Sequence, residues 1–400
     1  MSIQNTQLRI SDAEYRARCV ALQSHLHENQ LSGVVLFDAD YIKYYTGFHF
    51  IPTERPMAFA FSANGERALF VPRLEAEHAK ANALIDRVDH YPEYPGDPHP
   101  IVTLAKMLKD MGIAGTVGAD SDGYPWVFGY RGAPLSEAAG VTVRNVRAFI
   151  EDQMMIKSPA ELNLLRESVR WANLAHVLLQ RYTVVGASET HVSERASLEA
   201  THAMLDALGP IYRNQSPYYD SVVAGYRGQI GRNAAIPHAL AANITFQPGD
   251  VLVTGASAPV WGYHCELERS MIMGAATDEQ KFFFDHMVGL QDAAFAAMGP
   301  GVPCSEVDKA VRGYFNKHDL MPYWKHHTGH AIGLRYHEAP FLDTGDNTVM
   351  QPGMVFTVEP GLYKSGVGGF RHSDTVLITD DGIEMMTYYP RDLESLTLPV

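Results

Sequence analysis

Two glutamates, Glu266 and Glu268, stand in an otherwise apolar part of the chain. The apolar run 251–254 precedes them and has the pattern of a buried strand, and the apolar run 271–273 follows them. Residues i and i+2 of a strand point to the same face, so the two carboxylates are expected side by side. Burying such a pair without partners is costly, which favours a functional site. The alternative is an exposed edge strand with two solvated acids.

Three later stretches add histidines and acids to this pair. The run 326–333 leads to His337, Glu359 ends an apolar strand-like run, and residues 369–378 begin polar and continue apolar. A single histidine is weak evidence, because the chain has 18. The candidate catalytic set, ordered along the chain, is His238, Glu266, Glu268, His330 and Glu359, with His337 as a substrate-binding candidate.

In this order and spacing, the stretches resemble the creatinase/aminopeptidase P/prolidase/methionine aminopeptidase family. The resemblance implies an α/β (α+β) protein. A small N-terminal creatinase-like α/β domain over residues 1–156 would be followed by a C-terminal pita-bread catalytic domain over residues 157–400. No single motif is decisive, and the specificity lies in the set of stretches taken together.

The family's metal-dependent members carry five ligands, which the resemblance places on Gly255, Glu266, His330, Glu359 and Ser373. Glycine and serine cannot replace the carboxylates that a paired-metal site needs. The sequence therefore predicts a metal-independent enzyme without a cofactor. The alternative is a single Zn²⁺ on the three remaining ligands, with one position open.

The metal-free member of the family is creatinase, whose catalytic histidine and two glutamates fall on His238, Glu268 and Glu359. Glu266 is additional, which suggests a related cationic substrate. The resemblance implies a hydrolase that opens the cyclic amidine of ectoine to N-acetyl-2,4-diaminobutyrate, for a downstream deacetylase to consume. The alternatives are creatine hydrolysis, an X-Pro metallopeptidase such as prolidase or aminopeptidase P, a catalytically inactive binding module, and a lyase acting on a sulfonium osmolyte.

The expected roles follow from this chemistry. Glu268 and Glu359 would bind amidinium N–H groups, and Glu266 would act as nucleophile or general base. Arg55 or Arg335 would pair with the substrate carboxylate. In creatinase, an arginine at the position of Arg55 reaches the neighbouring subunit's site, so the resemblance implies a homodimer.

The composition excludes several other classes of function. The 400 residues are 46% hydrophobic and carry a formal net charge of −14, which disfavours nucleic acid and anionic membranes as partners. Three cysteines do not form a disulfide framework, although Cys265 beside the acidic pair must be weighed as a nucleophile. The polar first ten residues and the absence of a long apolar run predict a cytoplasmic, soluble protein.

The elements that must position these residues can also be predicted. A capping box at Ser11 opens a helix, and Asn64-Gly65 predicts a hairpin between apolar runs. In the second domain, long helices are expected over 158–181, 188–208, 277–298 and 305–318, and the sheet is expected to begin within 218–223.

Overall fold

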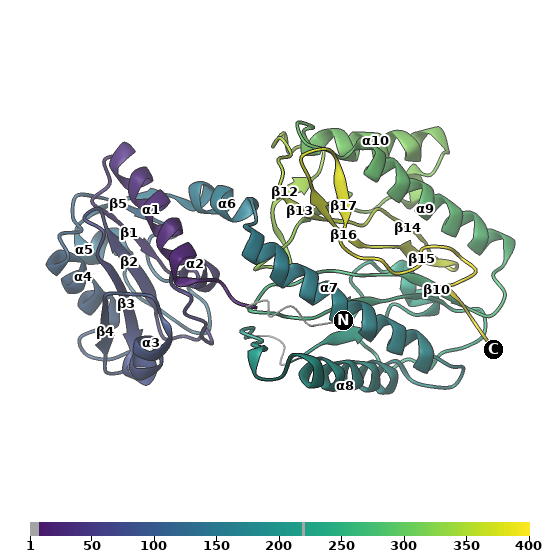
Figure 1. Cartoon of the computed structure of the whole chain (residues 1–400), viewed down its shortest axis with the longest axis horizontal. Helices are drawn as coiled ribbons and strands as arrows, with labels where there is room; N and C mark the ends of the chain where they lie inside the picture. Colours follow the sequence, from purple (N-terminus) through teal and green to yellow (C-terminus); the bar gives the residue numbers. More distant parts are fainter. Residues whose placement is uncertain (1–7, 218–220) are drawn as a thin grey trace. The chain divides into compact units, whose positions relative to one another are not determined.

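A six-stranded mixed sheet forms the centre of the first unit, Ile10–Met154, of the computed structural model, which describes residues 8–217 and 221–400. The strand order is β4-β3-β2-β1-β5-β6 (Figure 1). The strands are β1 (Gly33–Leu36), β2 (Ala58–Ser62), β3 (Arg67–Pro72), β4 (Arg87–Tyr91), β5 (Thr116–Ala119) and β6 (Thr142–Asn145). The helices are α1 (Asp12–Glu28), α2 (Ala39–Thr46), α3 (Ala76–Asn82), α4 (Pro100–Asp110) and α5 (Leu135–Ala139).

Local sequence explains this sheet well. Ser11 caps α1, and Gly65 takes the positive φ of 94° that the predicted turn between β2 and β3 requires. The face of the sheet toward α4 and α5 is covered by buried apolar side chains such as Leu104 and Leu108. The predicted α/β architecture of this part of the chain is therefore confirmed.

The second unit, Met155–Val400, holds strands between two pairs of helices (Figure 1). The pair α9 and α10 contacts strands on one side, and α7 and α8 contact strands on the other. Its helices are α7 (Pro159–Tyr182), α8 (Glu189–Leu208), α9 (Asp278–Ala297) and α10 (Cys304–Lys317), and α6 (Arg147–Met155) leads into it. One sheet has the order β12-β11-β13-β16-β17, a second has the order β18-β10-β8, and β14-β15 and β7-β9 form pairs.

The strands of this unit are short. They are β7 (Val223–Gly225), β8 (Val251–Val253), β9 (Gly255–Ser257), β10 (Ser270–Met273), β11 (Gly329–Ala331), β12 (Glu338–Leu342), β13 (Val355–Val358), β14 (Gly361–Lys364), β15 (Gly368–Arg371), β16 (Asp374–Ile378), β17 (Ile383–Met385) and β18 (Thr397–Leu398). Most of their side chains are buried, so packing rather than strand length holds them in place.

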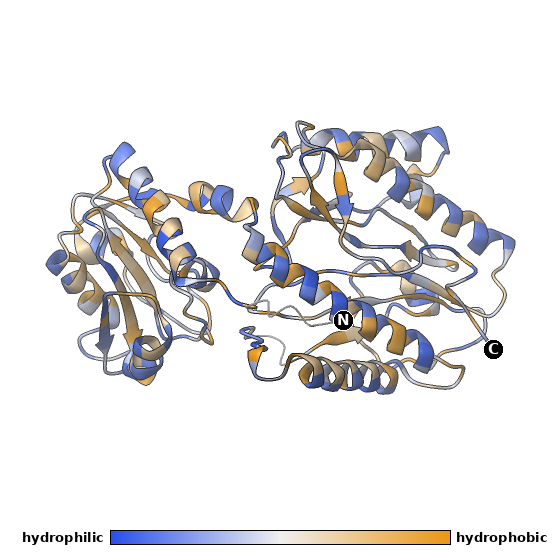
Figure 2. Cartoon of the chain, viewed as in Figure 1, coloured by the Kyte–Doolittle hydropathy of each residue, from blue (hydrophilic) through white to orange (hydrophobic). Residues whose placement is uncertain are grey.

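Capping explains where the long helices begin. Ser158 and Thr277 each form a complete capping box, with Glu161 and Gln280 as the reciprocal partners, and Pro159 occupies the first turn of α7. Polar and apolar residues alternate along α7 and α8 in Figure 2, as expected of helices that cover a sheet with one face.

One local expectation was wrong in detail. Glu266 and Glu268 do not lie within a regular strand, because β10 begins only at Ser270. Isolated bridges pair Leu267 with Ala256 and Glu268 with Ser373 instead. The start of the sheet that was predicted within 218–223 falls partly outside the described residues.

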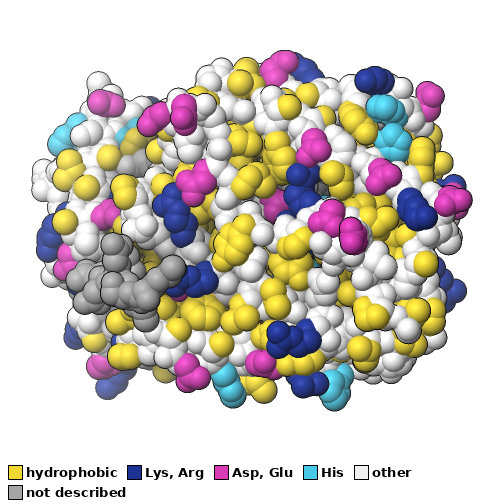
Figure 3. Space-filling model, turned by 45° about the vertical axis from the view of Figure 1, so that its right-hand side comes forward, with side chains coloured by type: hydrophobic (Ala, Val, Ile, Leu, Met, Phe, Trp, Pro, Cys, Tyr) yellow, Lys and Arg dark blue, Asp and Glu magenta, His cyan; other side chains and the backbone are white. Residues whose placement is uncertain are grey.

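Charged groups of both signs lie scattered among hydrophobic ones on the face seen in Figure 3. That face therefore shows no broad field of a single charge. Throughout the described part of the chain, no helix combines the length and the apolar composition that crossing a membrane requires.

Candidate functional site

Five of the predicted residues line one cavity of the second unit. The cavity has a volume of about 390 Å³, and Glu266, Glu268, Glu359, His238 and His337 contribute to its wall. The segment that carries the first two glutamates lies against the β9 strand on one side and the start of β16 on the other. Both carboxylates therefore face the same space although no regular strand imposes the alternation.

Glu266 and Glu359, which line this cavity, converge with the buried His330 behind its wall. Each offers one ligand atom, and these atoms all lie within 4.8 Å of one another. His330 stands in the middle of β11, and Glu359 directly follows β13, the strand paired with β11. Neighbouring strands thus bring together residues that are far apart in the sequence.

The hydrogen bonds of His330 leave one ring nitrogen available. Nδ1 lies 2.9 Å from the carbonyl oxygen of Ala331, which can only accept, so Nδ1 carries a proton. Nε2 lies 3.1 Å from Glu359 Oε1, which is an ion-pair distance, and it makes no hydrogen bond of good geometry within the described residues. A fixed Nδ1–H, with Nε2 turned toward the carboxylates, is typical of a metal-binding histidine.

The three groups strongly perturb one another. Burial, together with the charges of Glu359 and Glu268, raises the pKa of Glu266 to about 8. Burial also acts to raise the pKa of Glu359, but His330 and the guanidinium of Arg371 hold it well below its usual range. Carboxylates packed this closely need a cation nearby to stay ionised together.

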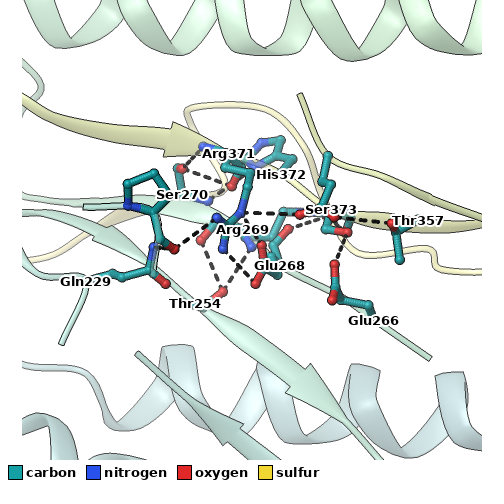
Figure 4. A network of polar contacts seen from close by, with 12 residues as sticks. Gln229, Thr254, Glu266, Glu268, Arg269, Ser270, Thr357, Arg371, His372 and Ser373 are labelled. Atoms are coloured by element: carbon teal, nitrogen blue, oxygen red, sulfur yellow. Dashed lines mark hydrogen bonds and ion pairs between the residues drawn. The ribbon is translucent and has the colours of Figure 1, made fainter. Parts of the chain in front are cut away.

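Glu268 already has such cations. Its buried carboxylate accepts hydrogen bonds from Arg371 Nε and Nη2 at 2.5 and 2.9 Å (Figure 4). Arg227 Nη2 adds a third at 2.7 Å. Glu268 is therefore paired with guanidinium groups of the chain itself. Its predicted role as a carboxylate that receives substrate N–H groups stays a prediction that this pairing disfavours.

Hydroxyl groups orient Glu266 and Glu359, the two acids of the converging set. Ser373 Oγ donates to Glu266 Oε1 at 2.7 Å (Figure 4). Thr357 Oγ1 lies 3.3 Å from Glu359 Oε1 and accepts from the backbone N–H of His330. These contacts fix the rotamers of the converging groups, as partners of metal ligands do in known sites.

The arrangement fits one divalent ion and does not fit two. Three mixed nitrogen and oxygen ligands leave a position open for water or substrate, as in catalytic one-metal sites. Gly255 offers no ligand atom, and a side chain there would begin 3.6 Å from Glu268 Oε1. Ser373 supplies a hydroxyl, which is engaged by Glu266, and Glu268 is engaged by Arg371.

The remaining predicted residues are placed differently. His337 stacks on His330 with ring centroids 3.8 Å apart, and His238 is exposed in the turn after a short 3₁₀ helix. The backbone N–H of Arg335 binds Glu338, and the guanidinium of Arg335 does not line the cavity. Arg55 belongs to the first unit, where it pairs with Glu54 and Glu93.

Cys265 is not an activated nucleophile. Its side chain is fully buried, and burial raises the pKa of its thiol to about 11. A reactive cysteine needs an environment that favours the thiolate, which this one lacks.

The candidate set drawn from the sequence did not include several residues of the cavity wall. They are Arg227, Lys325, His326, His327 and Arg371. Arg371 lies two residues before Ser373, so its place beside the ligand positions could have been noticed. Arg227 stands between glycines in an irregular segment, and no periodicity marks it.

Comparison with known proteins places this geometry in a family. Residues 163–380 match the model of metallopeptidase family M24, and residues 18–155 match that of the creatinase/prolidase N-terminal domain. The Xaa-Pro dipeptidase of Pyrococcus furiosus is 27% identical over 82% of this chain and 86% of its own length. The probable dipeptidase PepE of Mycobacterium bovis is 28% identical over 97% of this chain and 98% of its own length.

Solved structures agree on the architecture. Dipeptidase PepE from Mycobacterium ulcerans superposes with a TM-score of 0.81 and 25% identity, covering 98% of this chain and all of its own. The prolidase from Pyrococcus horikoshii gives a TM-score of 0.78 at 24% identity, covering 94% of this chain and 99% of its own. The predicted fold class, including the pita-bread domain, is confirmed.

The same comparisons correct the predicted activity. Opening of ectoine and metal-independent catalysis were expected, but the matching family is one of metallopeptidases, and the relatives are named as dipeptidases. The error came from the empty ligand positions at Gly255 and Ser373, which we took to favour a metal-free enzyme over the alternative of an X-Pro metallopeptidase with a single ion. The three ligands that converge around His330 are sufficient for one ion.

The family assignment rests on most of the chain rather than on a single motif. The two family models together run from residue 18 to residue 380, with few residues between them. The peptidase family model alone matches more than half of the residues of this chain. The chain therefore belongs to metallopeptidase family M24.

Proposed function

We propose that the protein hydrolyses the C–N bond of small dipeptide-like substrates, in the manner of an Xaa-Pro dipeptidase. One divalent ion would be held by Glu266, His330 and Glu359. The observation that carries the proposal is the convergence of these ligand atoms within 4.8 Å, with His330 Nε2 free of hydrogen bonds among the described residues. The reaction class is supported by the relatives that are named as Xaa-Pro dipeptidases.

A bound divalent ion supplies a Lewis acid that polarises a carbonyl and lowers the pKa of water. The residues of the chain form the cavity and orient the proposed ligands. The cavity of about 390 Å³ is in the size range of small-ligand sites. Ser373 and Thr357 hold the carboxylates of Glu266 and Glu359, so that the ligand atoms need little reorganisation.

Two histidines at the cavity are candidates for proton transfer. His238 is exposed and lines the cavity, so it can exchange protons with solvent and donate one to a departing nitrogen. His337 covers one face of the His330 ring and restricts its movement. We assign His238 as the proton donor and His337 as a positioning residue.

A substrate panel with and without metal tests the proposal. The panel compares alanyl-proline, alanyl-leucine and N-acetylated alanyl-proline, using purified protein that has been chelated and then reloaded with Zn²⁺, Mn²⁺ or Co²⁺. We expect one ion per chain by elemental analysis and hydrolysis of alanyl-proline only after reloading. A reloaded protein that binds one ion but cleaves no dipeptide would refute the proposed substrate class.

Variants locate the ion independently of turnover. Glu266→Gln and Glu359→Gln are expected to lose bound metal, whereas His202→Asn, which changes an exposed histidine of α8, should retain it. Metal content unchanged in both glutamate variants would contradict the assignment of ligands.

We further propose a homodimer in which Arg55 contacts the substrate of the neighbouring subunit. The support is the resemblance to creatinase and the position of Arg55 in the first unit. Light scattering gives the molecular mass in solution, and Arg55→Ala is expected to raise KM while leaving that mass unchanged. A fully active monomer would contradict this part of the proposal.

A further inference from the structure

Arg227 is an exposed cation beside the candidate site. Its side chain is 53% exposed, whereas that of Arg371, on the same carboxylate, is 3% exposed. Arg227 lines the cavity that holds the metal-binding candidates and also an adjoining cavity of about 280 Å³. The two cavities also share Glu266, Glu268 and His337, so Arg227 stands where they meet.

The geometry points to Arg227 as the residue that binds the carboxylate of the substrate and selects substrates that carry one. This inference rests on the proposed function and names the specificity determinant of the same site. Arg227 was not among the candidate residues predicted from the sequence, and it is not one of the proposed metal ligands.

The backbone around Arg227 is held in a defined conformation. Its φ is 50°, in the left-handed region that a residue with a side chain adopts at some cost. The next residue, Gly228, donates its N–H to the buried carboxylate of Glu189 at 2.7 Å. Glu189 also accepts from the N–H groups of Ala242 and Ile244, at 2.7 and 3.1 Å. One carboxylate at the start of α8 thus anchors both ends of the loop that carries Arg227.

Only part of the Arg227 guanidinium is engaged. Nη2 donates to Glu268 Oε1 at 2.7 Å and lies 3.3 Å from Gln229 Oε1. Within residues 8–217 and 221–400, no hydrogen bond is recorded for Nε or Nη1. Arg371 differs, because Nε and Nη2 bind Glu268 and Nη1 lies 3.2 Å from the Tyr363 hydroxyl oxygen.

Neutralising Glu268 does not require Arg227. Arg371 already provides that carboxylate with two hydrogen bonds and a full positive charge in a buried position. A second, half-exposed guanidinium on the same oxygen is better explained by a ligand. Its remaining N–H groups can bind a carboxylate from the cavity side, which is the geometry that guanidinium groups favour.

The charge of the site favours an anionic substrate. The two cavities are lined by the carboxylates of Glu266, Glu268 and Glu359 and by the cations Arg227, Arg371 and Lys325. When all three acids are ionised, these charges balance, so a divalent ion bound to them would leave the site positive. Lys325 is the other candidate for the carboxylate, but it lines only one cavity, and its Nζ lies 3.2 Å from the carbonyl oxygen of Ala235.

Paired substrates separate carboxylate binding from a structural role. Wild type, Arg227→Ala and Arg227→Lys are compared on alanyl-proline and on its C-terminal amide. We expect Arg227→Ala to lower kcat/KM for the free acid about 10- to 100-fold, mainly through KM, and to change the amide little. Arg227→Lys should recover part of the loss. Equal losses on both substrates, or no loss, would overturn the inference.

A matched control and a binding readout complete the test. Arg232 is exposed on the same loop and does not line either cavity, so Arg232→Ala should leave both substrates unaffected. In chelated wild-type protein, N-acetyl-proline should protect Arg227 from phenylglyoxal, read by peptide mass mapping, and its amide should not. This readout needs no turnover, so it distinguishes failure of the inference, seen as no protection, from failure of the proposed dipeptidase activity.

Discussion

Arg371 and Glu268 form a two-pronged ion pair that is buried beside the ligand cluster. The nitrogens Nε and Nη2 lie 2.5 and 2.9 Å from the two carboxylate oxygens, and both side chains are less than 5% exposed. Each charge is thus compensated only by groups of the protein. Such a pair depends on both members, because removing Arg371 leaves the buried carboxylate of Glu268 with only the half-exposed Arg227 as a counter-charge.

We therefore expect Arg371→Met to destabilise the protein by about 3–5 kcal/mol. The double variant Glu268→Gln/Arg371→Met should recover part of this loss, because no uncompensated charge remains. Urea denaturation followed by circular dichroism measures both. The control is Arg166→Ala, which breaks an ion pair with Glu384 that is more than 40% exposed on both sides and should cost at most about 1 kcal/mol. A double variant less stable than the sum of its single variants would contradict this account.

Ser373 is expected to support metal binding without being a ligand. Its hydroxyl donates to Glu266 Oε1 at 2.7 Å and fixes that carboxylate toward His330. Ser373→Ala should therefore weaken metal affinity about 10- to 100-fold, as the loss of similar supporting contacts does elsewhere. Competition with a chromophoric chelator gives the affinity. Ser24→Ala, at an exposed position in the first unit, is the control, and equal affinity in the two variants would exclude a role for the Ser373 hydroxyl.

The loop that carries Arg227 and His238 is expected to depend on Glu189. The carboxylate of Glu189 accepts from three backbone N–H groups, two of them from residues beyond His238. Glu189→Gln replaces one acceptor oxygen by a donor, so at least one of these N–H groups loses its partner. We expect faster hydrogen exchange at Gly228, Ala242 and Ile244. Glu194→Gln, an exposed change on the same helix, should leave that exchange unaltered; acceleration in both variants would point to a general loosening of α8.

The predictable part of the molecule is the part governed by local rules. The helix start after Ser158 and the turn at Gly65 were found because their signals lie within four residues of the feature they create. The converging set was found through the order of its motifs. The pairing of Glu268 with Arg371 joins residues 103 positions apart, and no local pattern encodes it. The convergence of Glu266, His330 and Glu359 is likewise a tertiary contact that no local pattern encodes. The effect of the missing ligands at Gly255 and Ser373 on metal binding was therefore misjudged.

Some short strands of the second unit were harder to predict, although the apolar run that forms β8 was recognised. β9 follows β8 after a single residue, Thr254, and is only three residues long. A strand as short as β9, with no apolar run to mark it, carries too little alternation to be recognised from sequence. Their positions are determined by buried contacts with distant segments, such as the pairing of β9 with β7.

The stability of the second unit is expected to fall in acid because of His176. This side chain of α7 is fully buried, and its Nε2 lies 2.7 Å from Thr254 Oγ1, which itself donates to the carbonyl oxygen of Arg269. Nε2 must therefore be the protonated nitrogen of a neutral ring. Nδ1 has no hydrogen-bond partner among the described residues. Burial and the nearby charge of Arg269 lower the pKa of His176 to about 3.

The sign of the pH effect follows from this lowered pKa. In the unfolded chain, His176 takes up a proton below its ordinary pKa of 6.5, whereas in the folded protein it stays neutral until about pH 3. Its contribution to stability is thus fully present above pH 6.5 and declines toward pH 3, by about 1.4 kcal/mol per pH unit. Between pH 7 and 5, we expect wild type to lose about 2 kcal/mol more than His176→Gln, measured by urea denaturation at both pH values. His202→Asn should behave as wild type, because that histidine is exposed. An equal loss of stability in wild type and His176→Gln would show that other groups cause the acid sensitivity. The next group to test is then the buried His372, because its pKa is also lowered well below its usual range.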